Sequence, residues 1–274
     1  MAVAGAGHAP LVLFLHGFPE FWWAWRAQLP AIAAAGYRAA AMDLRGYGGS
    51  DKTPRGYDPA TLAHDVAGVV RSLGARSAVL VGQSWGGYVA WTTAVLHPGL
   101  VRALAPVASP HPLHALGMLR RGPLARHLIS MQMPLLPERR IMAEEAAYVA
   151  DLLHSWTAPE SAFPDAEALR RYRGGMSVWP SPHCALEYHR WVVRSRVRAD
   201  GRRFVTAMRQ PVSAPVLQVA GTHDPLMRPA DLEQSRRHVS GPFAVSTIEG
   251  AGHFPHEEQP ERFNRVLLDW LDTL

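Results

Sequence analysis

Three residues that can act together in nucleophilic catalysis stand in this chain, each in a turn after an apolar run. Ser84 is the central residue of a Gly-x-Ser-x-Gly turn in LVGQSWGGYVAW, residues 80–91. Asp224 lies in VAGTHDPLM, and His253 lies in EGAGHFPHEEQP near the carboxyl terminus. A serine hydroxyl becomes a nucleophile when a histidine takes its proton, and an acid orients that histidine. We therefore predict a triad of Ser84 as nucleophile, His253 as base and Asp224 as acid.

Two neighbouring histidines are weaker candidates for the base. His256 falls three residues after His253, where the following helix is expected to start, and His223 adjoins the acid and is expected to shape its turn. The glycines around Ser84 would also fit a plain strand-to-helix turn. Here, however, the turn follows a buried strand and precedes a helix, which is the setting that exposes such a serine for catalysis.

The segments that must position these residues alternate between apolar runs and helix-compatible stretches. Short continuous apolar runs predict buried parallel strands. Apolar residues at helical spacing predict the intervening helices, with Thr61 as the N-cap of one and Pro260 near the start of another. The alternation predicts an α/β fold, in which helices cover both faces of a mainly parallel sheet. The expected strands lie within 9–18, 38–48, 77–84, 101–109, 214–224 and 243–253, and the expected helices lie within 25–37, 61–74, 86–98 and 260–274.

The alternation stops between residues 110 and 210, which are rich in Arg, Met, Trp and Pro and contain no convincing strand. We predict a helical cap, or lid, of residues 110–210, inserted into a core of residues 1–109 and 211–274. The first buried strand starts close to the amino terminus, so the leading antiparallel strands are expected to be shortened or missing. The exposed sheet edge could then pair with a second copy of the chain in a homodimer.

The composition excludes several other classes of protein. The chain has 274 residues, a net charge of +5 and one cysteine, Cys184, which excludes an intrachain disulfide framework and a multi-cysteine metal site. The sequence has neither a long apolar stretch nor a signal-peptide pattern, so we expect no membrane span and a cytoplasmic protein. No nucleic-acid-binding motif is present. The basic segment 190–203 is expected to be a solvated helix face; the alternative is a patch for acidic substrates or carrier proteins.

Longer phrases resemble one family. HGFPEFWWAWR (16–26), DLRGYGGSDK (43–52) and GQSWGGYVAW (82–91) look like the epoxide hydrolase branch of the α/β-hydrolase superfamily, to which haloalkane dehalogenases are near relatives. The resemblance covers nearly the whole chain, and the order Ser, Asp, His along the chain is that of the superfamily. It implies an oxyanion hole formed by the backbone N–H groups of Phe18 and Trp85.

The chain departs from the epoxide hydrolase pattern at three positions. The resemblance places an aspartate where this chain has Ser84, and lid tyrosines where it has His189, in LEYHR, and Ser130, in SMQMPLLPER. A serine that opened an epoxide would form an ether, which activated water does not readily hydrolyse. A serine that attacks an acyl carbon forms an ester, which that water can hydrolyse. The joint replacements therefore favour acyl chemistry.

Aromatic residues are expected to form the substrate-binding wall. His189 could bind a polar group, shuttle a proton or merely pack among the lid residues, and Tyr148 and Tyr188 are alternative hydroxyl donors. Core packing is expected for Trp91 and Trp156, while the methionines of SMQMPLL fit an adaptable apolar lid. The predicted apolar wall consists of Trp22, Trp23, Trp85 and Trp179.

The sequence as a whole predicts a serine hydrolase that cleaves an ester, thioester or lactone of a mostly apolar small molecule. No metal or organic cofactor is required for this chemistry. Three alternatives stay open: an epoxide hydrolase or dehalogenase-type activity, an acyltransferase or cyclase, and a non-catalytic binding protein on a hydrolase body. The apparently complete triad counts against the last alternative.

Overall fold

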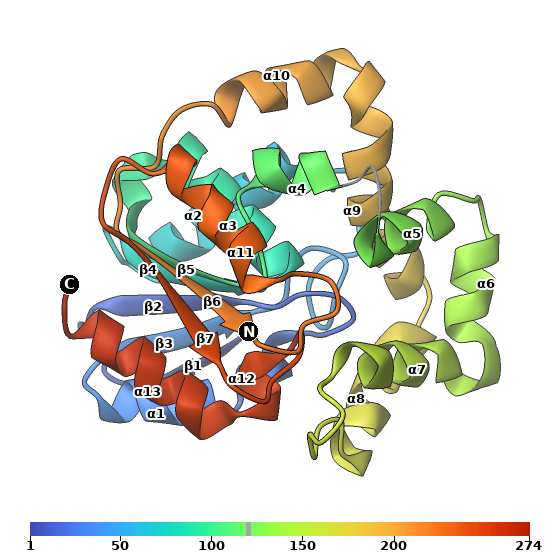
Figure 1. Cartoon of the computed structure of the whole chain (residues 1–274), viewed down its shortest axis with the longest axis horizontal. Coiled ribbons are helices and arrows are strands. Elements are labelled where there is room, and N and C mark those ends of the chain that lie inside the picture. The colour runs from blue at the N-terminus through green and yellow to red at the C-terminus, as the bar shows by residue number, and fades with distance from the viewer. Residues whose placement is uncertain (119–121) are drawn as a thin grey trace.

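The computed structural model describes residues 1–118 and 122–274, and its centre is a seven-stranded sheet (Figure 1). The strand order is β1-β3-β2-β4-β5-β6-β7. Strands β2 to β7 pair in parallel, and β1 pairs antiparallel with β3 at one edge. The strands are β1 (Ala2–Ala4), β2 (Leu11–Leu15), β3 (Arg38–Met42), β4 (Ala78–Gln83), β5 (Val101–Val107), β6 (Val216–Gly221) and β7 (Phe243–Ile248).

Burial explains why the strands read as continuous apolar runs. Every residue of β2, β4 and β6 is buried, as expected for parallel strands that helices cover on both faces. Strand β7 lies at an edge and is only partly buried. The leading antiparallel part of the sheet is the three-residue β1, in line with the expected shortening.

Helices cover the sheet on its two faces (Figure 1). Helices α1 and α13 pack against one another on one face, and α2 and α3 do so on the other. The expected N-cap of α2 was wrong: Asp58 caps this helix by accepting a hydrogen bond from the backbone N–H of Thr61, and Pro59 occupies its first turn. These core helices are α1 (Gln28–Ala34), α2 (Pro59–Ser72), α3 (Trp85–Leu96), α11 (Pro229–Glu233), α12 (Pro255–Glu258) and α13 (Pro260–Leu271).

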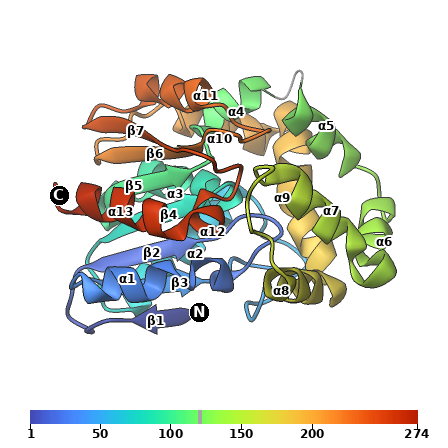
Figure 2. The ribbon, with the colours of Figure 1, turned by 60° about the horizontal axis from the view of Figure 1, so that its bottom comes forward.

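Between β5 and β6 the described residues form helices and no strand of the sheet. Most of this helical segment stands beside the core (Figure 2), while α4 contacts α3, and Phe204 of α10 stacks on Tyr88 of α3. Its helices are α4 (Pro112–Met118), α5 (Pro123–Ser130), α6 (Leu136–Met142), α7 (Ala147–Trp156), α8 (Ala166–Ser177), α9 (Ser181–Arg194) and α10 (Ala199–Ala207). Short 3-10 helices are η1 (Trp22–Trp25), η2 (Pro98–Leu100), η3 (Ala143–Glu145), η4 (Ser195–Val197) and η5 (Gln234–His238). Within the described ranges, no helix has the length and apolar character needed to cross a membrane.

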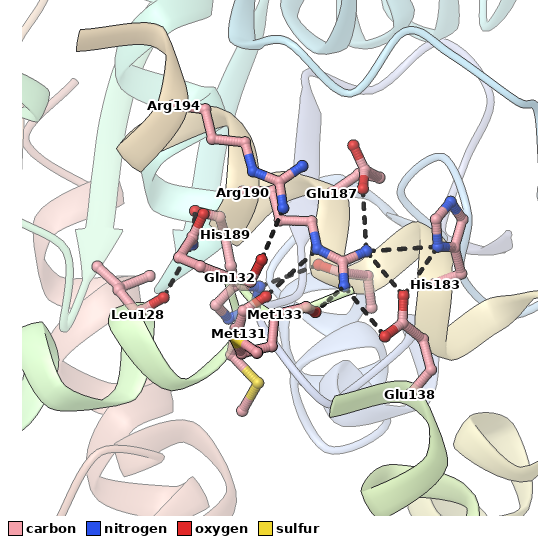
Figure 3. A network of polar contacts seen from close by, with 11 residues as sticks. Leu128, Met131, Gln132, Met133, Glu138, His183, Glu187, His189, Arg190 and Arg194 are labelled. Carbon is pink, nitrogen blue, oxygen red and sulfur yellow. Dashed lines mark hydrogen bonds and ion pairs between the residues drawn. The ribbon is translucent and has the colours of Figure 1, made fainter. Parts of the chain in front are cut away.

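A buried arginine braces the helical segment (Figure 3). The guanidinium of Arg190, on α9, donates to both carboxylate oxygens of Glu138 on α6, at 2.7 and 3.0 Å. It also donates to the carbonyl oxygens of Met131 and Met133, in the turn that follows α5. A bidentate pair that is buried and further hydrogen-bonded fixes direction as well as distance. The network therefore sets the positions of α5, α6 and α9 relative to one another.

Candidate active site

Ser84 occupies a strained turn between β4 and α3. Its φ of 48° and ψ of −112° lie in a region that non-glycine residues rarely adopt. Two glycines permit this turn: a Cβ on Gly82 would lie 2.4 Å from the carbonyl oxygen of Gly86, and a Cβ on Gly86 would lie 2.1 Å from that of Leu15. The Ser84 N–H donates to the carbonyl of Val107 at 2.9 Å, which ties the turn to β5.

The loop after β2 packs directly against this turn. A Cβ on Gly17 would lie 1.9 Å from Oε1 of Gln83 and 2.9 Å from the Cβ of Ser84, so only glycine allows this approach. Gln83 in turn donates to the carbonyl oxygen of His253 at 3.0 Å. Phe18, which follows Gly17, lines the same cavity as Ser84, and so does Trp85. The two residues predicted to supply oxyanion amides therefore lie beside the predicted nucleophile.

The predicted base and acid form a buried hydrogen-bonded pair. Because a carboxylate only accepts, Nδ1 of His253 donates to Oδ2 of Asp224, at 2.9 Å. The other oxygen of Asp224 accepts from the backbone N–H groups of Leu226 and Met227, at 2.8 and 3.0 Å. This arrangement holds the carboxylate still and leaves Nε2 of His253 as the nitrogen free to take a proton.

One further carboxylate holds the loop that carries His253. Glu258, on α12, accepts backbone N–H groups from Gly252 at 2.8 Å and from Phe254 at 3.0 Å, the two residues that flank the histidine. It also accepts the N–H of Ala158, just after α7, at 2.9 Å. Glu258 thus connects the histidine loop with the helical segment, a role that no pattern in the sequence indicated.

Ser84 and His253 line one cavity, but no hydrogen bond joins them in this structure. Nε2 of His253 is buried and has no partner among the described residues. The hydrogen bond between nucleophile and base is often long in a free enzyme and shortens when substrate is bound. The cavity has a volume of about 60 Å³, and apolar side chains from α4, α5, α9 and the loop that follows Asp224 form part of its wall.

Two histidines of the helical segment face this cavity. His189 lines it, as predicted, but both ring nitrogens are engaged: Nδ1 donates to the carbonyl of Ala185 at 3.0 Å, and Nε2 accepts from the indole N–H of Trp85 at 3.2 Å. Burial lowers the pKa of His189 to about 4, so the ring is neutral at neutral pH. His127, on α5, lies with its ring centroid 5.1 Å from that of His189, and burial lowers its pKa as well.

Two aromatic rings of the helical segment, those of His127 and Trp156, line the cavity although no site role was predicted for either residue. His127 lines the cavity, whereas Ser130, to which a lid position was assigned, is exposed and donates to the carbonyl of His127 at 2.7 Å. Trp156 was expected in the core, but it also lines the cavity, and its carbonyl accepts the backbone N–H of His253 at 2.8 Å. The spacing of apolar residues in α5 and α7 does not indicate which face of each helix lines the cavity.

Five of the predicted substrate-binding residues are corrected, because they do not line this cavity. Tyr188 is buried and donates to the carbonyl of Arg45 at 2.7 Å. The ring of Tyr148 stacks under the guanidinium of Arg140, and Trp179 is 55% exposed.

Trp22 and Trp23 belong to η1, and neither residue lines the cavity. The backbone N–H of Trp22 donates to Asp43, and the ring of Trp23 packs against Arg26 and Tyr172. Trp91, expected in the core, is fully buried and donates to the carbonyl of Ser109. Within residues 1–118 and 122–274, no three His, Cys, Asp or Glu side chains gather as metal ligands.

The family model described as "alpha/beta hydrolase fold" matches residues 10–260 of the chain. The chain belongs to the α/β-hydrolase fold family. This α/β-hydrolase is 32% identical to epoxide hydrolase 3 of Xenopus tropicalis over 98% of its own length and 73% of that protein. It is 31% identical to epoxide hydrolase A of Mycobacterium tuberculosis over 99% of its own length and 93% of that protein.

A solved structure is also similar to this chain over nearly its whole length. The crystal structure of epoxide hydrolase A from Mycobacterium thermoresistibile matches this α/β-hydrolase with a TM-score of 0.84 and 27% identity, over 98% of this chain and 93% of that chain. The predicted fold and the predicted resemblance to the epoxide hydrolase branch are therefore confirmed. These relatives are named as epoxide hydrolases. Whether this chain shares that activity depends on the residues of its own site.

Proposed function

We propose that this α/β-hydrolase is a serine hydrolase that cleaves an ester, thioester or lactone bond of a mostly apolar small molecule. The observation that carries the proposal is the position of Ser84. Its hydroxyl projects from a strained strand-to-helix turn into a largely apolar cavity that also contains His253, whose Nδ1 donates to Asp224. These are the parts of an acyl-transfer site.

The proposed reaction has two halves. Nε2 of His253 takes the proton of Ser84 as its oxygen attacks the carbonyl carbon, and the backbone N–H groups of Phe18 and Trp85 stabilise the oxyanion. The imidazolium returns the proton to the leaving alcohol or thiol as the acyl bond breaks. Water then attacks the acyl-enzyme ester on Ser84 and gives a proton to His253. His253 passes this proton to the oxygen of Ser84 as the carboxylic acid product departs.

The helical segment supplies the apolar roof of the site in this proposal and acts as its lid. His127, Leu128 and His189 of α5 and α9 line the cavity opposite the sheet. An apolar enclosure excludes water and strengthens the hydrogen bonds that the oxyanion receives. A hydroxyl from a second substrate could replace water in such a site, so acyl transfer and cyclisation remain variants of the same mechanism.

The relatives named as epoxide hydrolases support a second candidate, in which His253 activates water directly for attack on an epoxide. Ser84 argues against the covalent route to this product, because the ether that it would form resists hydrolysis. His189 also lacks a free proton to stabilise an alkoxide, since its Nδ1–H is used by Ala185.

A fluorophosphonate probe distinguishes the two candidates. We expect stoichiometric labelling of Ser84, mapped by mass spectrometry, no labelling of the Ser84→Ala variant, and turnover of aryl esters that this substitution abolishes. A well-folded protein that resists labelling but hydrolyses epoxides would refute the acyl-enzyme mechanism. Epoxide turnover that survives in Ser84→Ala would identify water activation by His253 as the reaction.

A further inference from the structure

The cavity wall includes a tyrosine whose buried hydroxyl the proposed mechanism does not use. Tyr88, on α3, lines the cavity together with Ser84 and is only 6% exposed. Its Oη is buried and has no hydrogen-bond partner among the described residues. Leaving a buried hydroxyl unpaired costs about 1–3 kcal/mol, so such a group calls for an explanation.

Tyr88 is held close to the reacting serine by the geometry of α3. It follows Ser84 by four residues, its backbone N–H donates to the carbonyl of Ser84 at 2.9 Å, and both residues line the same cavity. Its ring contacts Trp85 at 5.6 Å and stacks on Phe204 of α10 at 5.9 Å between centroids. These contacts fix the ring within the wall, in the first turn of the helix that follows the nucleophile.

The surroundings of the hydroxyl keep it protonated. Burial raises the pKa of Tyr88 far above its usual value, so the group both donates and accepts at any working pH. The indole N–H of Trp85, whose ring contacts that of Tyr88, already donates to His189. No described group pairs with Oη of Tyr88, so a polar atom of a bound molecule can be its partner.

We propose that Tyr88 hydrogen-bonds a second oxygen of the substrate, several bonds from the scissile carbonyl. This inference rests on the proposed function and narrows its substrate class to esters, thioesters or lactones that carry a further ether, hydroxyl or carbonyl oxygen on the acyl or the alcohol side. A plain hydrocarbon ester would fill the cavity but leave the tyrosine hydroxyl unpaired, and would react more slowly for that reason.

Matched probes in which one oxygen replaces one methylene test the proposal. The first pair consists of fluorophosphonates with a 2-methoxyethyl or a butyl group, and their rates of labelling Ser84 are compared. The other pairs are 2-methoxyethyl and butyl butanoate, and phenyl 3-methoxypropanoate and phenyl pentanoate, for which kcat/KM is compared. We expect a preference of about fivefold or more for the oxygen-containing member of at least one pair.

Tyr88→Phe removes a single oxygen atom and should reduce that preference to near unity, with little change for the hydrocarbon member. Tyr47→Phe is the matched control, since Tyr47 also has a buried, unpaired hydroxyl but lies outside the cavity. It should leave the preference unchanged. Neither variant should have a lower Tm, because each loses an unpaired polar atom.

The outcomes separate this inference from the function on which it rests. The role of Tyr88 is overturned if Ser84 is labelled but both members of every pair react equally well. It is also overturned if the preference persists in Tyr88→Phe. In both cases the serine hydrolase proposal stands. A loss of rate in Tyr88→Phe that is equal for both members also overturns the role of Tyr88, because a packing defect would act in that way. No labelling by any probe overturns the proposed function itself, and this inference with it.

Discussion

Replacement of Glu258 by glutamine tests how the structure holds the proposed catalytic histidine. The two carboxylate oxygens accept three backbone N–H groups, from Gly252, Phe254 and Ala158, at 2.8 to 3.0 Å. In Glu258→Gln an NH2 group replaces one carboxylate oxygen. This NH2 group is a hydrogen-bond donor and would face a backbone N–H, which is also a donor. At least one buried N–H then loses its partner, and the remaining contacts lose the contribution of the charge.

The magnitude follows from these contacts. Hydrogen bonds to a charged group contribute about 1.5–3 kcal/mol each and neutral ones about 1 kcal/mol, so the loss of one and the weakening of two destabilise the fold by about 3 kcal/mol. A typical domain has a free energy of unfolding of about 5–15 kcal/mol, so Glu258→Gln should still fold at 25 °C. The expected decrease in Tm is about 6–12 °C.

The same change should displace His253, because two of the three N–H groups belong to its immediate neighbours. A displacement of about 1 Å in a reacting group can reduce a rate by about a hundredfold. We therefore expect Ser84 in Glu258→Gln to react with a fluorophosphonate about 10–100 times more slowly at 25 °C, where the variant is folded.

Urea denaturation and the labelling rate of Ser84 measure the two effects separately. Glu261→Gln is the control, since Glu261 is exposed in the first turn of α13 and should cost less than about 1 kcal/mol. If Glu258→Gln is no less stable than this control, the three contacts do not hold the loop. If it is less stable but Ser84 reacts at the normal rate, the carboxylate supports the fold without positioning His253.

Three further substitutions test other parts of the same structure. Asp224→Asn should reduce the labelling rate of Ser84 by about 10⁴ without unfolding the protein, because an amide can hold the imidazole in the wrong tautomer; near-normal labelling would contradict the assignment of the acid. Arg190→Met should destabilise the fold by about 3 kcal/mol in urea, since it leaves the buried carboxylate of Glu138 with His183 as its only side-chain partner among the described residues, whereas the more exposed Arg194→Met should change stability little; an Arg190→Met variant as stable as Arg194→Met and the wild type would show that the network contributes nothing. His189 has a pKa of about 4 when folded against about 6.5 when unfolded, so its contribution to stability is complete above pH 6.5 and is lost as the pH falls toward 4, by about 3 kcal/mol. His189→Gln should therefore lose less stability than the wild type between pH 7 and pH 4.5, and equal losses would refute a buried neutral histidine.

The sheet, and the proximity of the three residues of the predicted triad, could be predicted from the sequence because both follow local rules. Parallel strands must be apolar throughout, so each reads as a short apolar run that ends in a turn. The carboxyl ends of such strands meet at one edge of the sheet. Ser84, Asp224 and His253 each follow a strand, so their proximity follows from strand order without any knowledge of side-chain contacts.

The cavity wall could not be predicted in the same way. Adjacent residues on a helix point about 100° apart, so Tyr188 and His189 could not both face the cavity, yet the sequence does not say which of them does. Tertiary contacts decide the matter: Tyr188 finds a partner in the carbonyl of Arg45, and His189 in the indole N–H of Trp85. The roles of His127 and Trp156 depend on how α5 and α7 pack, and the sequence periodicity carries no information about that packing.

The polar atoms around Ser84 bear on the choice between acyl and epoxide chemistry. Opening an epoxide places negative charge on an alkoxide, which needs a proton donor in the roof of the site. The only N–H of the neutral His189 ring already donates to the carbonyl of Ala185. Attack on an acyl group places the charge next to the nucleophile instead, where the amides of Phe18 and Trp85 are proposed to receive it. A serine at position 84 and a roof histidine whose N–H is engaged are thus both consistent with the proposed acyl chemistry. In that proposal, backbone amides of the core stabilise the developing charge, and the helical segment recognises the substrate.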